Sequence, residues 1–516
     1  MKNSLAAIFL ILSCINTCAW AATKPNIVII YADDIGYGDI GVYGGTGVDT
    51  PAIDKLARQG LRFTSAYATA STCTPSRYSL LTGQYAFRNK DAIILAGNAP
   101  LIIDPKKPTM ASMLRDAGYA TALVGKWHLG LGDPSQPLDW NGRIAPGPKE
   151  VGFDYSFHMA ATGDRVPSVY IENGHIVNLD KSDPVRVSYK KKIGSEPTGI
   201  SHSEQLRIQA DTQHSGTIVN GISRIGTMVG GKAARWTDED MPDVFLNKAL
   251  QFIEKKRNTP FFLFYATHEN HVPRAPHPRF VGSSSLGLRG DAIAQFDWSV
   301  GKVIAKLTEL KLATNTLVIL SSDNGPVLFD GYWDGAVEKN GAHRPAGPFS
   351  GGKYSVNEGG TRMPFIVSWP GRVSPGISDA LISQADLITS IAPLVGGKLN
   401  NSKTLDGQNL IATLLGDSFQ GRDALIQQGV NSKAIRKGDW KYIPPGSITN
   451  RGKIGKFNRT KVAEPGLLYF LPEDPQERNN LAARYPQIVK SLRKELQKRV
   501  GGSSATKSTA KQLGFE

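Results

Sequence analysis

The chain has 516 residues, which at roughly 100–200 residues per domain allows a large domain and a smaller one. Hydrophobic residues make up 40% and charged residues 20%, a globular composition that excludes wholesale disorder. Sixty Lys and Arg against 45 Asp and Glu give a net charge of +15, which suits an anionic partner such as nucleic acid, anionic lipid or acidic polysaccharide.

The N-terminus indicates export. Residues 1–21 read as a signal peptide, with Lys2 before a short apolar run and an Ala-x-Ala cleavage site ending at Ala21. We expect a periplasmic or secreted protein; a lipid anchor at Cys14 is the less favoured alternative. No later stretch approaches the 18 apolar residues of a membrane span, and an exported protein is not expected to meet nucleic acid.

Apolar, β-branched runs alternate with helical patterns along the chain, which predicts an α/β fold: a large, mostly parallel sheet sandwiched by helices. The expected strands are Asn26–Tyr31, Ala120–Val124, Phe261–Tyr265, Thr316–Ser321 and Phe365–Trp369. The expected helices are Thr50–Gln59, Pro108–Asp116, Asp238–Arg257 and Asp291–Leu310. Residues 180–232 are polar and weakly patterned, and are interpreted as a long insertion.

The sequence pattern changes near Asp406, from long strands and helices to short elements. Short strands separated by Gly, Pro and Asp turns, followed by a helix over Tyr485–Val500, predict a small α+β subdomain with an antiparallel sheet. We therefore divide the chain into a signal peptide (1–21), a catalytic α/β domain (22–405), a C-terminal subdomain (406–500) and a flexible tail (501–516).

Two acidic pairs follow apolar strands. Asp33-Asp34 ends the first strand and Asp323-Asn324 ends the fourth, at the edge of the sheet where ligands bind in open α/β folds. Three carboxylates and an amide carbonyl are hard oxygen ligands that suit Ca²⁺ or Mg²⁺. The alternative is that each pair merely caps its loop.

Cys73 is the one cysteine outside the signal peptide. Thr74-Pro75 reads as a helix start, which places Cys73 at a helix N-terminus, and Arg77 lies about one turn further on. A nucleophile, an anion-binding helix end and an arginine thus converge. The alternative is a buried structural cysteine, the commonest fate of an unpaired one.

These residues carry a family resemblance: Cys-x-Pro-x-Arg followed by Leu-Thr-Gly resembles the signature of the type I sulfatases of the alkaline phosphatase superfamily. The resemblance covers about residues 25 to 485. Its other segments are Asp33–Asp39, Gly125–Gly130, His271–Pro273, Asp323–Gly325, Gly351–Lys353, Glu358–Arg362, Arg436–Lys441, Leu468–Tyr469, Asp474–Glu477 and Asn480–Leu481.

The resemblance implies a mechanism. A maturation enzyme would oxidise Cys73 to formylglycine (3-oxoalanine), whose hydrate attacks sulfur, forms a covalent sulfate ester and later expels sulfate. One Ca²⁺ would be held by Asp33, Asp34, Asp323, Asn324 and the modified residue 73, and would contact sulfate. Arg77, Lys126 and Lys353 would stabilise charge, His128 would be the base, and His271 the acid that protonates the leaving alkoxide.

The substrate pocket is less specified. Loop residues Asp164, Arg165, His268, His343 and Arg344 are candidate substrate contacts, with Asp330 and Trp333 beside the last two. The expected substrate is a sulfated polysaccharide or its oligosaccharides, such as carrageenan, ulvan or another sulfated galactan, and the basic charge also fits a glycosaminoglycan. Two alternatives stay open: a phosphodiesterase or phosphonate monoester hydrolase on the same fold, and a noncatalytic glycan-binding protein.

Overall fold

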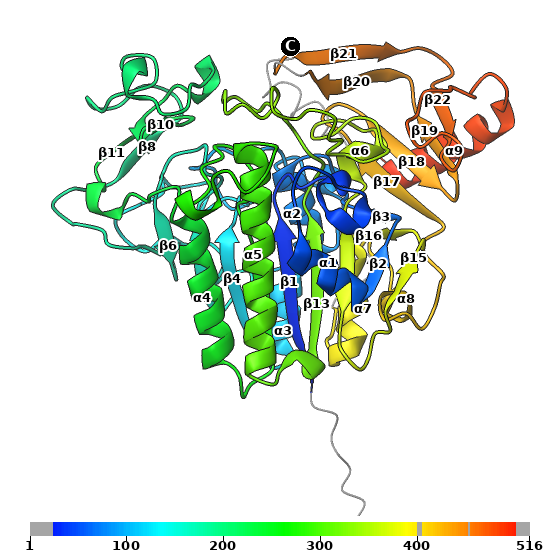
Figure 1. The fold of residues 1–516 in the computed structure, drawn as a ribbon, viewed down its shortest axis with the longest axis horizontal. Coiled ribbons are helices and arrows are strands. Elements are labelled where there is room, and N and C mark those ends of the chain that lie inside the picture. Colours follow the sequence, from blue (N-terminus) through cyan, green and yellow to red (C-terminus); the bar gives the residue numbers. More distant parts are fainter. Residues whose placement is uncertain (1–23, 400–404, 453–454, 502–516) are drawn as a thin grey trace, which may run out of the picture.

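A computed structural model describes residues 24–399, 405–452 and 455–501. Its centre is a ten-strand sheet, in the order β15-β2-β14-β13-β1-β12-β4-β5-β6-β7 (Figure 1). Its strands are β1 Asn26–Ala32, β2 Leu61–Phe63, β4 Ala120–Lys126, β5 Tyr155–Met159, β6 Tyr170–Glu172, β7 His175–Ile176, β12 Phe261–Ala266, β13 Thr316–Ser322, β14 Phe365–Ser368 and β15 Gly376–Ser378. The predicted signal peptide, and the predicted tail beyond Gly501, lie outside the described residues.

The middle of the sheet is parallel, as predicted, and its flanks are mixed. Strands β13, β1, β12, β4 and β5 run parallel, with Ile29 of β1 beside Phe264 and Ile319 of its two neighbours. Strand β14 is antiparallel to β13 and β2, and β6 is antiparallel to β5 and β7. The carboxyl ends of the five parallel strands therefore share one edge of the sheet.

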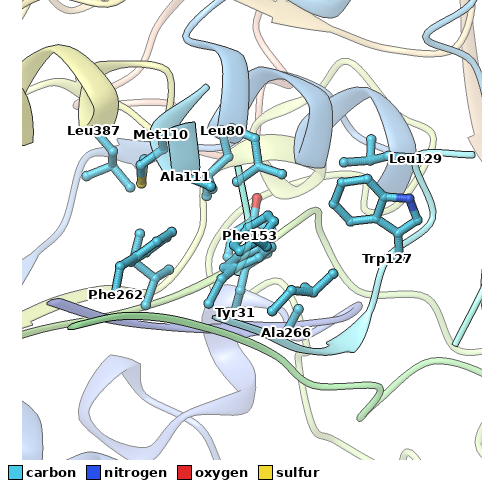
Figure 2. Packing of buried hydrophobic residues seen from close by; sticks show 14 of the residues in the cluster. Tyr31, Leu80, Met110, Ala111, Trp127, Leu129, Phe153, Phe262, Ala266 and Leu387 are labelled. Atoms are coloured by element: carbon cyan, nitrogen blue, oxygen red, sulfur yellow. The ribbon is translucent and has the colours of Figure 1, made fainter. Parts of the chain in front are cut away.

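Helices cover both faces. Ile27, Ile29 and Tyr31 of β1 face a core closed by α2 (Cys73–Thr82), α3 (Met110–Asp116) and α7 (Asp386–Val395), part of which is shown in Figure 2. The alternate residues Val28 and Ile30 face α1 (Pro51–Arg58), α4 (Met241–Lys255) and α5 (Leu288–Glu309); α4 and α5 lie in front of the sheet in Figure 1. This alternation is why a central strand is apolar throughout.

The insertion predicted over residues 180–232 contains short elements. They are β8 Arg186–Ser188, β9 Ile218–Val219, β10 Ile222–Ser223, β11 Thr227–Val229, η4 Ser203–Gln205, η5 Thr212–His214 and η6 Lys232–Ala234. The insertion is anchored by Arg224, which is wholly buried and donates to Gly163 O (2.5 Å) and to Asp238 Oδ2 (2.7 Å). It is thus a packed part of the domain that reaches back to the loop containing Asp164.

The remaining short elements connect these layers. They are β3 Ala66–Tyr67, β16 Ile382–Ser383, α6 Glu358–Thr361, α8 Ile411–Leu414, η1 Tyr37–Asp39, η2 Gly41–Tyr43, η3 Ala86–Arg88, η7 Pro278–Phe280 and η8 Ala313–Asn315. Among the described residues, no helix is both long and apolar enough to span a bilayer.

A separate antiparallel sheet forms near the C-terminus, as predicted. Its strands are β17 Ala424–Gln428, β18 Lys433–Lys437, β19 Trp440–Ile443 and β22 Leu467–Phe470. Helix α9 (Pro486–Val500) packs on this sheet. A hairpin formed by β20 (Gly446–Arg451) and β21 (Phe457–Val462) projects from it (Figure 1). Main-chain bonds join β17 to the segment before α2: Ser71 N donates to Gln428 O (2.9 Å) and Gln428 N donates to Thr69 O (3.0 Å). The domain boundaries drawn from the sequence stay predictions.

A buried ionic cluster connects this sheet to the segment 350–358, which follows β13 in the chain. Lys441 Nζ lies 3.1 Å from Glu358 Oε1 and 2.8 Å from Glu477 Oε1, and all three side chains have no exposed surface. Glu477 Oε2 in turn accepts hydrogen bonds from Ser350 Oγ (2.9 Å) and from the main-chain N–H of Glu358 (2.7 Å). The cluster therefore fixes both ends of the segment 350–358, which carries Lys353.

Replacing Lys441 should destabilise the protein strongly. Lys441→Met leaves the buried carboxylate of Glu477 without its cation and leaves Glu358 to Arg362 and Arg436, so we expect the free energy of unfolding to fall by about 3–5 kcal/mol in denaturant titration. Lys437→Met is the matched control, because the Lys437–Asp423 pair is 41% and 68% exposed and should contribute under about 1 kcal/mol. Equal unfolding midpoints for the two variants would contradict the role given to Lys441.

Candidate active site

Polar side chains gather at the edge where the parallel strands end. Asp33 and Asp34 follow β1, Asp323 and Asn324 follow β13, and Lys126 is the last residue of β4. These strands belong to one parallel block in the order β13-β1-β12-β4, so their carboxyl ends lie along the same edge of the sheet. The sequence prediction that both acidic pairs share one edge of the sheet agrees with this arrangement.

Three carboxylates form the floor of the site. Asp33, Asp34 and Asp323 are wholly buried and each offers an oxygen within 4.8 Å of the others. Burial raises the pKa of Asp33, and the negative charge of Asp323 raises it further. The pKa of Asp323 lies below its usual value, because the positive charge of Arg77 outweighs the effect of burial there. Such a group of like charges requires cations.

The donor set fits a divalent cation. Asn324 donates from Nδ2 to Asp34 Oδ1 (2.6 Å), while its buried Oδ1 has no hydrogen-bond partner within the described residues. An orphaned carbonyl oxygen beside three carboxylates is the all-oxygen environment that Ca²⁺ or Mg²⁺ prefers. The residues present therefore fit a hard divalent ion.

Three cationic side chains compensate the carboxylates. Arg77 donates from Nε to Asp323 Oδ2 (2.9 Å), Lys126 pairs with Asp33, and Lys353 Nζ lies 2.8 Å from Asp34 Oδ2. They come from α2, from β4 and from the loop after β13. Against the effect of burial, Asp330 and Asp34 raise the pKa of Lys353 well above its usual value, so its ammonium group stays charged.

Cys73 is the first residue of α2, as predicted. Its side chain is 3% exposed, and its Sγ lies 3.8 Å from Asp33 Oδ1. Burial raises the pKa of the thiol to about 12 although Lys126 and Lys353 oppose the shift, so the group is protonated at neutral pH. A protonated thiol in this position is a poor nucleophile.

Two histidines flank Cys73. His128 Nε2 donates to Leu95 O (3.0 Å), which leaves the buried Nδ1 without a partner in the part of the chain described. His271 Nδ1 donates to Val272 O (2.6 Å), and a nitrogen of this ring lies within 4.8 Å of Cys73 Sγ and an Asp33 oxygen. Burial holds the pKa of each ring well below its usual value. The charge of Lys126 adds to this effect at His128, and the charge of Lys353 adds to it at His271. Both imidazoles are neutral here.

A cavity of about 30 Å³ opens at Cys73, and we call it the Cys73 cavity. Its walls are formed by Cys73, Ile94, His128, Asp164, Arg165, Gln213, His214, Ile225, His271, Asp330, Lys353, Tyr354 and Arg451. The structure thus brings together the nucleophile candidate, both flanking histidines, Lys353 and two of the predicted substrate contacts, Asp164 and Arg165.

Asp164 is the centre of a charged group in this wall. Arg165 Nη1 donates to both its oxygens (2.6 and 2.7 Å), and His214 Nε2 lies 3.4 Å from Oδ2. His214 Nδ1 is 2.6 Å from Asp211 Oδ1, and the two carboxylates raise the pKa of His214 against the effect of burial. A fixed set of donors and acceptors is therefore presented to the Cys73 cavity.

The other three predicted substrate contacts lie elsewhere. His268 Nε2 accepts a hydrogen bond from Gly163 N (3.2 Å), and burial lowers its pKa to about 3, so this ring is neutral. His343 Nε2 lies 2.9 Å from Asp39 Oδ1, a carboxylate that Arg289 also binds, and neither His343 nor the exposed Arg344 lines the Cys73 cavity. Asp330 comes from the same loop and does line the Cys73 cavity. Position within one loop therefore does not predict which of these side chains reach the cavity.

His214, Gln213, Tyr354 and Arg451 belong to the cavity but were not singled out from the sequence. His214 lies in the polar insertion, where Asp211 three residues earlier was the available signal. Arg451 ends a strand of the C-terminal hairpin, outside every recognised motif, and no local signal identifies it.

Replacing Asn324 should weaken divalent cation binding without unfolding the protein. Asn324→Ala removes one carbonyl ligand, so we expect Ca²⁺ affinity to fall about tenfold or more by calorimetry on metal-free protein, a loss of about 1.4 kcal/mol. Asn315→Ala, before the opposite end of β13, is the matched control. Unchanged affinity in Asn324→Ala would exclude Asn324 as a ligand.

Comparison with known proteins places this geometry in a family. The family model described as Sulfatase matches residues 25–397. An N-acetylgalactosamine-6-O-sulfatase of Bacteroides thetaiotaomicron is 49% identical over 91% of this chain and 92% of its own length. Human arylsulfatase A and human N-acetylgalactosamine-6-sulfatase are each 31% identical over 92% of this chain, and over 87% and 84% of their own lengths.

A solved structure agrees with these relatives. A Bacteroides thetaiotaomicron sulfatase, described under the metabolism of multiple glycosaminoglycans, superposes with a TM-score of 0.90 at 48% identity, covering 93% of this chain and 100% of that one. A family model over most of the chain and relatives of this similarity settle the class of enzyme. The chain belongs to the sulfatase family and is a hydrolase of sulfuric esters.

Proposed function

We propose that this sulfatase removes the 6-O-sulfate of N-acetylgalactosamine in oligosaccharides derived from glycosaminoglycans. The observation that carries the proposal is the Asp164, Arg165 and His214 group in the wall of the Cys73 cavity, on a chain 49% identical to an enzyme of that name. A carboxylate, a guanidinium and an imidazole held in one place are suited to bind the hydroxyl groups of one sugar.

This substrate is of the glycosaminoglycan class that the basic charge also fitted, and it takes the place of the sulfated galactan that was expected first from the sequence. The structure of a carrageenan-bound relative is 23% identical with a TM-score of 0.68, a similarity that speaks for the fold alone. The amino sugar is supported instead by a relative that aligns over nearly the whole of both chains.

The nucleophile is formylglycine made from Cys73 by a maturation enzyme. Within the described residues Cys73, at the start of α2, is the single cysteine, and its buried, protonated thiol suits neither a disulfide nor direct attack. The hydrated aldehyde supplies a geminal diol, one hydroxyl of which attacks sulfur while the other later releases sulfate. His128 takes the proton of the diol, because its buried Nδ1 has no hydrogen-bond partner among the described residues and the ring lines the same cavity as Cys73.

Ca²⁺ is the proposed ion at Asp33, Asp34, Asp323 and Asn324, where it would supply a Lewis acid for a sulfate oxygen. Arg77, Lys126 and Lys353 hold the carboxylates in position and face the remaining sulfate charge. The bound sulfate anion would allow His271 to take up a second proton, and the imidazolium then gives its Nε2 proton to the leaving sugar oxygen while Nδ1–H stays bonded to Val272 O. We also propose export, with the predicted signal peptide removed.

The test of this function is sulfate release from defined sugars. The enzyme used is a sample in which mass spectrometry shows the Cys73 peptide ~18 Da lighter than the thiol form. We expect ion chromatography to detect sulfate released from 6-sulfated N-acetylgalactosamine oligosaccharides and none released from carrageenan oligosaccharides. His214→Ala should lower kcat/KM about tenfold or more, since it leaves a sugar hydroxyl without its partner and leaves Asp164 with Arg165 as its remaining charged partner among the residues of this group. His175→Ala, exposed on β7, is the matched control. Release from the galactan alone would reject the proposed substrate.

The two flanking histidines should differ in their dependence on the leaving group. A sugar alkoxide needs a proton in the transition state and a phenolate does not, so His271→Ala should reduce turnover of the sulfated sugar by about 10²–10⁴-fold more than turnover of an aryl sulfate. His128→Ala should impair both equally, because it acts on the nucleophile.

Each rate is corrected for the fraction of folded enzyme that contains formylglycine. Equal losses for His271→Ala on the two substrates would assign His271 to sulfate binding. The acid would then be sought at Lys353, whose charged ammonium also lines the Cys73 cavity.

A further inference from the structure

A larger cleft of about 550 Å³ adjoins the Cys73 cavity, and we call it the Arg451 cleft. It lies between the loop 326–353 and the C-terminal residues 450–452 and 476–477, and both Lys353 and Arg451 line it as well as the Cys73 cavity. Lys353 Nζ and Arg451 Nε bind the two oxygens of the same carboxylate, Asp330, at 2.9 and 3.3 Å. One carboxylate thus links Lys353 and Arg451, the two cationic residues that are shared by the cleft and the Cys73 cavity.

The guanidinium of Arg451 is held in a fixed orientation. Its Nε donates to Phe329 O (3.0 Å), and its central carbon lies 4.6 Å from the ring centre of Phe457 and 5.6 Å from that of Tyr354. Neither Nη atom makes a hydrogen bond with any described residue. Two parallel N–H groups of a preorganised arginine are therefore available to a ligand, in the geometry that fits a carboxylate or sulfate.

The charge of the cleft favours an anion. Arg344 is exposed in its wall, and the carboxylate of Glu477 is already bound by Lys441, Ser350 and the main-chain N–H of Glu358. Next to it, the ring of Trp333 is 55% exposed and packs 5.1 Å from Phe329, a residue of the cleft. An apolar ring beside free cationic donors suits an acidic sugar, whose apolar face stacks while its anionic group is bound.

We propose that the Arg451 cleft is a second anion subsite, which binds the carboxylate or sulfate group of the sugar next to the one that is desulfated. The proposal rests on the proposed function, because that function places a 6-sulfated sugar at Cys73. Arg451 acts as a specificity-determining residue that favours an acidic oligosaccharide over the single sulfated sugar. The net charge of +15 has the sign that such a polyanion requires.

The test compares four substrates: 6-sulfated N-acetylgalactosamine, its disaccharide with a hexuronate, the same disaccharide with the carboxyl reduced to an alcohol, and one whose second sugar carries a sulfate. For the native enzyme, kcat/KM should be higher on the two disaccharides with an anionic second sugar than on the reduced one, through KM. The ranking of the hexuronate and the sulfate tells which source of the anion the subsite prefers.

Variants of Arg451 make the test specific. In Arg451→Met, the ratio of kcat/KM for the hexuronate disaccharide to that for the monosaccharide should fall by about tenfold or more, and Arg451→Lys should keep part of the preference. Lys461→Met, exposed on the same hairpin, is the matched control and should leave the ratio unchanged. An unchanged ratio in Arg451→Met, or equal rates on native and reduced disaccharides, would overturn the proposal.

Failure of the proposed function has a different signature. If no 6-sulfated compound releases sulfate, that function is wrong, and the subsite is then judged by calorimetric binding of the unsulfated hexuronate disaccharide. Binding that weakens about tenfold in Arg451→Met supports the subsite, and equal affinity for native enzyme and Arg451→Met overturns it.

Discussion

Three carboxylates without exposed surface, at the end of two adjacent strands, are the constraint on which the rest of the catalytic site depends. Removing such charges from water costs several kcal/mol per ion unless each is paired. Asp33, Asp34 and Asp323 meet their cations from three different segments, namely β4, the loop after β13 and α2. Neutralising the cluster therefore brings those segments together, and with them Cys73 at the start of α2.

The central sheet and the acidic edge could be predicted because their signals are local. The strand at Asn26 is apolar on both faces, as a buried parallel strand must be, and Asp33-Asp34 follows it directly. The direction of β14 could not be predicted in the same way. Its four residues are buried in either orientation, so composition does not distinguish an antiparallel partner of β13 from a parallel one.

Pairings across long stretches of chain limited the prediction of the pocket. His343 and Arg344 are neighbours in sequence, yet His343 is drawn to Asp39, 304 positions away, while Arg344 stays in solvent. Arg451 reaches the Cys73 cavity only because the hairpin β20–β21 extends over the loop after β13. Local pattern and motif carry no information on such contacts, which depend on how the two parts of the chain pack.

The bonds between β17 and the segment before α2 have a consequence for how the protein is made. Thr69 and Ser71, just upstream of Cys73, have their main-chain partner in Gln428, and Tyr85 bonds to Ile426 across 341 positions. During synthesis the first half of the chain leaves the ribosome long before these partners exist. The segment around Cys73 therefore acquires its partners in β17 only after most of the chain has been synthesised, and those bonds cannot hold Cys73 in place before that point.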